Sequence, residues 1–154
     1  MGDASAEGLV TLGRRVVAAG LVVASGGNLA VRLPEPDRIL VTPQGWALDD
    51  LDPAALVTVG LDGRHIHGVC APTTELALHR AAFGARPDAA VCLHLHPPMA
   101  MLLHAAGLPI RRITTDHAYY LRRLGTVPFI QPGSDELARA VAAEVGIDEV
   151  HAGV

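Results

Sequence analysis

The chain has 154 residues, half of them hydrophobic and only 3% aromatic, which suits one domain over residues 1–154 with a core of Ala, Val and Leu. The formal net charge of −4 and the lack of a strong basic cluster argue against a nucleic-acid partner. Two cysteines are too few for a disulfide framework, and neither a membrane-spanning segment nor a signal-peptide pattern is seen, so we expect a cytoplasmic protein that does not bind membranes.

The first part of the chain predicts a helix followed by hairpins. Apolar residues at helical spacing predict an amphipathic helix over residues 5–19, capped by a glycine. Turn signals then delimit two short strands at 29–33 and 38–41. Asp52 is expected to cap one helical turn, and the Asp-Gly pair at 62–63 predicts a hairpin between two further strands.

From Pro72 onward the pattern changes to alternating helices and strands. Helical spacing covers residues 73–85, an apolar strand follows at 90–96, and a short helix at 98–106. Residues 119–124 are ambiguous and 126–130 look like a strand. Ser134 is expected to cap a helix that ends near Gly146, and residues 147–151 begin a possible further strand. Hairpins followed by helix–strand alternation predict a three-layer α/β/α architecture with a mostly antiparallel central sheet.

The apolar strand at 90–96, which reads as buried, carries His94 and His96 near its end. Side chains alternate between the two faces of a strand, so Cys92, His94 and His96 share one face. Neutral imidazole is a good ligand for zinc and similar ions. On this pattern alone the pair is either half of a metal site or two hydrogen-bonded histidines in a polar core patch.

A second candidate site lies at the start of the helix that precedes this strand. Thr73 and Thr74 stand at or near the helix N-terminus, and Glu75 follows them. Free backbone N–H groups at a helix start suit an anion such as phosphate, although a threonine cap with an acidic first turn is also common. His79 shares a helix face with Glu75 and either touches the site or packs as a buried, hydrogen-bonded histidine; we favour packing.

Together these segments resemble the class II aldolase/adducin family, in the family's order and over nearly the whole chain. Residues 25–32 look like its S/T-x-G-N-x-S-x-R loop and strand, and residues 41–45 look like its Thr-Pro-x-Gly turn. Residues 72–79 look like its P-S-S-E…H segment, and residues 86–96 look like R-P-D-x-x-A-V-h-H-x-H, where h is hydrophobic. Several ordered motifs are far more specific than any one of them alone.

The resemblance implies a metal-dependent lyase of the aldolase type, which cleaves a phosphorylated ketose or sugar acid through a metal-stabilised enediolate. It implies a divalent metal bound by His94, His96 and His151, usually Zn²⁺, with Mn²⁺, Fe²⁺ and Co²⁺ as other candidates. Glu75 would be the acid/base, and Tyr119 or Tyr120 would either donate a proton to the leaving aldehyde or serve packing. The implied phosphate-binding residues are Gly27, Asn28, Thr42, Gly45, Thr73 and Thr74.

Two alternatives stay open. One is a non-catalytic assembly module like the adducin head; the other is a decarboxylase, dehydratase or epimerase that uses the same metal site. Residues 119–128 look somewhat like relatives that decarboxylate sugar-acid phosphates. Around His151 the family pattern h-h-L-x-N-H-G is matched without its Asn, and family members continue through a strand and helices that cover the sheet. Because that surface would be exposed in this C-terminally short chain, we expect a homo-oligomer, with a tetramer favoured.

Overall fold

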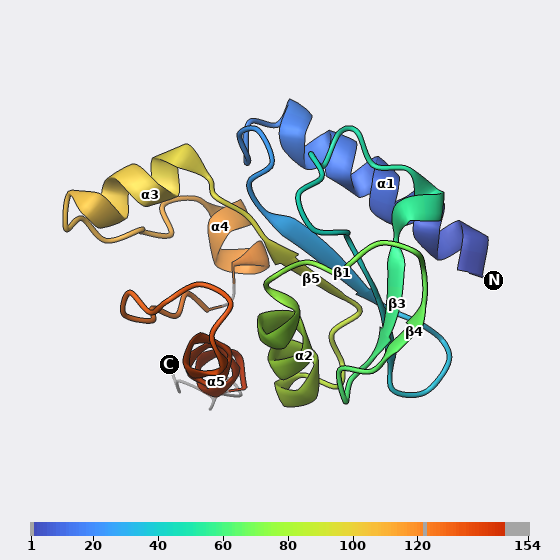
Figure 1. The fold of residues 1–154 in the computed structure, drawn as a ribbon. Coiled ribbons are helices and arrows are strands. Elements are labelled where there is room, and N and C mark those ends of the chain that lie inside the picture. The colour runs from blue at the N-terminus through green and yellow to red at the C-terminus, as the bar shows by residue number, and fades with distance from the viewer. Residues whose placement is uncertain (1, 122, 147–154) are drawn as a thin grey trace.

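A computed structural model describes residues 2–121 and 123–146, in which five strands form one antiparallel sheet of order β4-β3-β2-β1-β5. Figure 1 shows how the helices are arranged around this sheet. The strands are β1 (Asn28–Arg32), β2 (Arg38–Val41), β3 (Val57–Gly60), β4 (His65–His67) and β5 (Val91–His94). The helices are α1 (Gly2–Ala18), the 3-10 turn η1 (Pro53–Ala55), α2 (Leu76–Ala85), α3 (Pro98–Ala105), α4 (Thr115–Tyr120) and α5 (Asp135–Val145). None of the helices in this part of the chain has the length and apolar character needed to cross a bilayer.

The central strand β1 divides its side chains between two cores on opposite faces of the sheet. Leu29 packs in the core with Leu9, Val10 and other apolar residues of α1. Ala30, its neighbour, packs in the second core with Phe83 of α2. Because successive strand residues point to opposite faces, α1 and α2 cover the two sides of the sheet, and the predicted three-layer fold is confirmed.

Local signals fix the ends of several elements as predicted. The Asp52 carboxylate accepts a hydrogen bond of 2.9 Å from the N–H of Ala54 and so caps η1. The Ser134 hydroxyl accepts one of 3.1 Å from the N–H of Leu137 and caps α5. The hairpin between β3 and β4 also forms around the predicted Asp-Gly turn.

The strand carrying the histidine pair differs from the prediction of a buried strand. Regular pairing ends at His94, and β5 lies at the edge of the sheet, next to β1. Val91 and Leu93 are each 44% exposed. A short apolar run has the same sequence pattern whether its outer edge is covered or open, so the pattern could not place this strand.

The chain after β5 also departs from the predicted pattern. Residues 126–130 form no strand in the described structure, and the Phe129 side chain is 93% exposed. A strand needs a hydrogen-bonding partner as well as β-prone residues, and none of the described segments pairs with this one. The stretch 119–124, which the sequence left ambiguous, begins with the last two residues of helix α4. The possible strand at 147–151 lies outside the described residues.

Candidate active site

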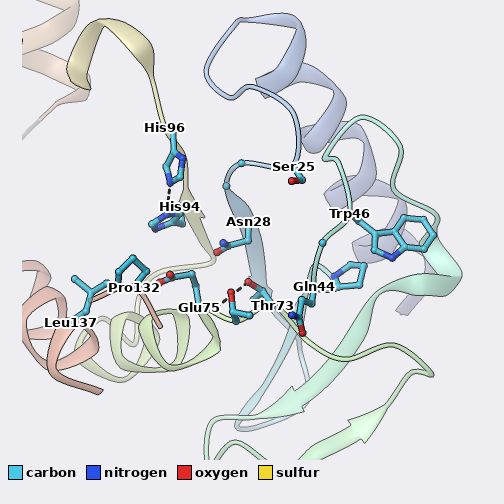
Figure 2. Close-up of a pocket in the computed structure, with 15 residues that line it drawn as sticks. Ser25, Asn28, Gln44, Trp46, Thr73, Glu75, His94, His96, Pro132 and Leu137 are labelled. Carbon is cyan, nitrogen blue, oxygen red and sulfur yellow. Dashed lines mark hydrogen bonds between the residues drawn. The ribbon is translucent and has the colours of Figure 1, made fainter. Parts of the chain in front are cut away.

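A pocket of about 280 Å³ opens where β1 begins and β5 ends, beside the start of α2 (Figure 2). It collects four segments that are distant in sequence: the glycine loop, the Thr-Pro-x-Gly turn, the start of α2 and the histidine pair. The lining residues are Ser25, Gly26, Gly27, Asn28, Pro43, Gln44, Gly45, Trp46, Thr73, Thr74, Glu75, His94, His96, Pro132 and Leu137. Eight residues expected from the sequence as metal, acid/base or phosphate residues are therefore brought together in one pocket.

The pairing of β1 with β5 sets Asn28 directly opposite His94. Facing residues of an antiparallel pair point to the same side of the sheet, so both side chains lie on the α2 side. Gly27 approaches β5 closely at this point. Its φ is +77°, and a Cβ added there would lie 2.7 Å from the His94 carbonyl oxygen. Only glycine accepts both the backbone conformation and the contact, so Gly27 lets the loop lie against the histidine strand.

His94 and His96 converge although His96 lies beyond the paired part of the strand. Their Nε2 atoms are 3.0 Å apart, and the ring planes are inclined at 73°. Two nitrogens bound tetrahedrally to one zinc ion lie about 3.3 Å apart, given bonds of roughly 2.0–2.1 Å. Burial lowers the pKa of His94; the charge of Glu75 opposes this shift and His96 adds to it. The favoured neutral imidazole is the form that binds metal, so the pair fits two ligands of a divalent cation.

Glu75 is buried at the N-terminus of α2, with 7% of its surface exposed. Its side chain makes no capping hydrogen bond, and its Oε2 atom has no hydrogen-bond partner among the described residues. The Thr73 hydroxyl instead accepts a hydrogen bond of 3.2 Å from the N–H of Glu75. An unpartnered buried carboxylate oxygen is costly, which is typical of a group held ready for a ligand or a proton.

The described residues could supply only part of the expected metal shell. No group of three or more His, Cys, Asp and Glu side chains within residues 2–121 and 123–146 is arranged to hold a metal ion. His151, the expected third ligand, lies outside the described residues. The histidine pair could thus provide two ligands, and the whole metal site stays a prediction.

His79 lies behind the pocket and is fully buried. Its Nε2 atom is 2.6 Å from Oδ1 of Asn28, while its Nδ1 atom has no hydrogen-bond partner among the described residues. Burial lowers the pKa of His79 to about 4, with a smaller contribution from His94. The ring is buried, as the favoured packing interpretation expects, but Nδ1 is unsatisfied within the described part of the chain and Nε2 contacts a residue of the pocket, so both interpretations of His79 stay open.

Three expected site residues do not line the pocket. Thr42 is buried, and its hydroxyl accepts a hydrogen bond of 3.2 Å from the N–H of Leu29, so it ties two strands together. Tyr119 and Tyr120 lie on α4, are 75% and 74% exposed, and contact each other edge to face. Their proposed roles stay predictions.

Other lining residues were not expected from the sequence. Gln44 is the variable residue of the Thr-Pro-x-Gly turn and Trp46 directly follows it, so proximity to that motif was an available signal. Pro132 and Leu137 reach the pocket because α5 packs beside α2. No local pattern indicates this long-range contact.

Comparison with known proteins assigns the fold and the motifs of this pocket to a family. Residues 7–154 match the Class II Aldolase and Adducin N-terminal domain, so the chain belongs to this family. A divalent metal is the cofactor that the family generally uses.

Individual relatives span several reactions. The chain is 31% identical over 144 residues to 3-oxo-tetronate 4-phosphate decarboxylase of Haemophilus influenzae, covering 90% of this chain and 68% of that protein. It is 33% identical over 121 residues to L-fuculose phosphate aldolase of Methanocaldococcus jannaschii, covering 79% and 65%. Its fold is similar to that of YgbL from Klebsiella pneumoniae, with a TM-score of 0.80, 32% identity and coverage of 92% and 70%. The chain thus spans about two thirds of the length of these relatives.

Proposed function

We propose that the protein is a metal-dependent lyase of the aldolase type, which cleaves a phosphorylated ketose or sugar acid. The observation that carries this proposal is the buried Glu75 carboxylate, whose Oε2 has no partner among the described residues and which lines one pocket with the His94–His96 pair. The phosphorylated substrates named for relatives of both the aldolase and the decarboxylase kind support a phosphorylated substrate.

The substrate phosphate would lie among the N–H and O–H donors at the start of α2 and in the glycine loop. Gly27, Asn28, Gly45, Thr73 and Thr74 all line this part of the pocket. Backbone amides at a helix start and in a loop with positive φ are well suited to an anion. These contacts would bind and orient the substrate, with its reacting carbons toward the histidine pair.

His94 and His96 would hold the divalent metal, with His151 as the proposed third ligand. Zn²⁺ is the first candidate, and Mn²⁺, Fe²⁺ and Co²⁺ are alternatives. When bound, the metal supplies a Lewis acid that stabilises negative charge developing on substrate oxygens. Glu75, buried beside the pair, would take up or deliver the proton on the reacting carbon.

Decarboxylation is the second candidate, favoured by the 31% identity to the Haemophilus influenzae decarboxylase over 90% of this chain. Both reactions would need the same residues, because breaking either bond leaves negative charge on substrate oxygens that the proposed metal would stabilise. Proton donation by Tyr119 or Tyr120, the homo-oligomeric state and the cytoplasmic location also stay predictions.

One assay tests the proposal and separates the two reactions. The purified protein is supplied with each of the four metals and with phosphorylated ketoses and sugar acids, and released aldehyde and CO₂ are measured separately. We expect metal-dependent turnover that His94→Ala abolishes. The control, His104→Ala, removes an exposed histidine of α3 outside the pocket and should leave turnover unchanged. Full activity without metal or in His94→Ala contradicts the lyase, and metal binding without any turnover favours the assembly module.

A further inference from the structure

We propose that His79 is a positioning residue: it fixes the side-chain amide of Asn28 so that the NH₂ group faces the pocket and donates to an anionic oxygen of the substrate. This inference rests on the proposed function, since it concerns how the same pocket holds a phosphorylated substrate. It assigns a task to a buried histidine that touches neither the reacting atoms nor the pocket surface.

The contact joins two of the elements that form the pocket. His79 lies on α2, one turn after Glu75, and its backbone N–H donates to the Glu75 carbonyl oxygen at 3.2 Å. Asn28 is the first residue of β1 and stands opposite His94. The bond of 2.6 Å between their side chains therefore connects the helix of the acid/base residue with the strand beside the metal ligands.

The surroundings of the ring indicate which atom donates. His79 is 0% exposed, and its Nδ1 atom has no partner among the described residues. If Nε2–H donates to Oδ1, Nδ1 is left with an unused lone pair. If instead the amide NH₂ donates to Nε2, the ring proton sits on Nδ1 as a buried N–H without an acceptor. Orphaned buried N–H groups are rarer than unused acceptors, so Nε2–H is the donor and Oδ1 the acceptor.

This arrangement decides what the pocket presents to a ligand. With Oδ1 held toward His79, the NH₂ group of Asn28 is directed away from it, and Asn28 lines the pocket. The chain has no lysine, and no arginine lines the pocket among the described residues. An anion there depends on neutral N–H and O–H donors. A flipped amide would set an oxygen against the anion, so a fixed orientation matters more than it would beside a cationic side chain.

Three variants separate positioning from packing. His79→Gln keeps a side-chain N–H near the place of Nε2, while His79→Leu fills the space without a donor. Asn28→Asp keeps an oxygen for His79 but has no NH₂ group. Binding of inorganic phosphate is measured by calorimetry on metal-free protein, with thermal unfolding as a check of folding and His104→Leu as the control.

We expect His79→Leu to weaken phosphate binding by about tenfold, the loss of one well-oriented hydrogen bond to a charged group. His79→Gln should stay within about threefold of wild type, Asn28→Asp should abolish binding and His104→Leu should change nothing. Equal weakening by Gln and Leu, or unchanged binding in Leu, would overturn the proposal. Absent phosphate binding by the wild type would also overturn it, but would leave the lyase proposal to the cleavage assay.

NMR spectroscopy tests the same proposal on the wild-type protein, so it does not depend on whether a variant folds. The ¹⁵N chemical shifts of the His79 imidazole report which ring nitrogen carries the proton. We expect the neutral ring protonated on Nε2. A ring protonated on Nδ1 would mean that Asn28 donates to His79 and turns its oxygen to the pocket, which overturns the proposal.

Discussion

The two walls of the pocket differ in how firmly the described residues hold them. On the β1–α2 wall, Thr73 lines the pocket while His79 and Thr42 lie behind it; all three are buried, and each makes a side-chain hydrogen bond to a neighbouring segment or turn. On the β5 wall, His94 and His96 stand at the end of a strand at the sheet edge, and their side chains contact each other through their Nε2 atoms. We infer that the first wall is preorganised for an anion, as the proposed function requires, and that a further ligand would complete the second.

The largest expected effect comes from removing the charge on the first wall. Glu75→Gln preserves the shape of the side chain but cannot exchange a proton as a carboxylate does. We expect turnover to fall by about 10²- to 10⁴-fold, the usual contribution of a positioned acid/base group. Steady-state kinetics measure this fall, and metal content serves as the control, because His94 and His96 are untouched. A fall of less than tenfold would show that Glu75 does not move the proton.

Leu29 and Leu93 offer a matched comparison, since they face each other across β1 and β5. Leu29 is 0% exposed and Leu93 is 44% exposed. Leu29→Ala should lower the free energy of unfolding by about 2–5 kcal/mol. Leu93→Ala should lower it by only about 1 kcal/mol, because the Leu93 side chain buries less apolar surface on folding. Denaturant unfolding measures both. Equal losses would mean that the β5 wall is covered in solution, as a homo-oligomer would do.

The pH dependence of stability tests the burial of the first wall. The pKa of His79 is lowered to about 4, whereas a histidine in an unfolded chain titrates near 6.5. Between these values the unfolded chain binds more protons, so this contribution to stability is present above about pH 6.5 and is lost as pH falls through 4. We expect a loss of about 3 kcal/mol over this range, and a smaller loss in His79→Gln, which does not titrate. Parallel curves for the two proteins would contradict a buried neutral His79.

The smallest expected effect concerns the contact between the walls. Gly27 and Gly45 both have positive φ, +77° and +78°, and both line the pocket. A Cβ at Gly27 meets the His94 carbonyl, whereas a Cβ at Gly45 meets nothing within 4 Å. Gly45→Ala should therefore cost about 1–2 kcal/mol of unfolding free energy from backbone strain alone, and Gly27→Ala about 1 kcal/mol more. Equal losses of unfolding free energy in the two variants would show that Gly27 does not lie in close contact with β5.

The sequence predicted features whose cause is local. The caps at Asp52 and Ser134, the Asp-Gly hairpin and the alternation that brings His94 and His96 to one side all depend on neighbouring residues, and all are present. The family motifs supplied the rest of the site by resemblance, and eight of their residues line one pocket.

Features that depend on distant partners were beyond the sequence. Whether β5 is central or at an edge depends on what pairs with its far side, and residues 126–130 resemble a strand but find no pairing partner among the described segments. Pro132 and Leu137 enter the pocket only through the packing of α5 on α2. The bond between His79 and Asn28 likewise joins residues 51 positions apart.

We propose above all that His94 and His96 bind the catalytic metal beside Glu75. Anomalous diffraction from crystals grown with Zn²⁺ tests it most directly, because the signal locates the ion independently of any assumed ligand. We expect one strong peak about 2.0–2.1 Å from Nε2 of both histidines, with an open position toward Glu75. No peak at the pair, or a peak held by other residues, would contradict it.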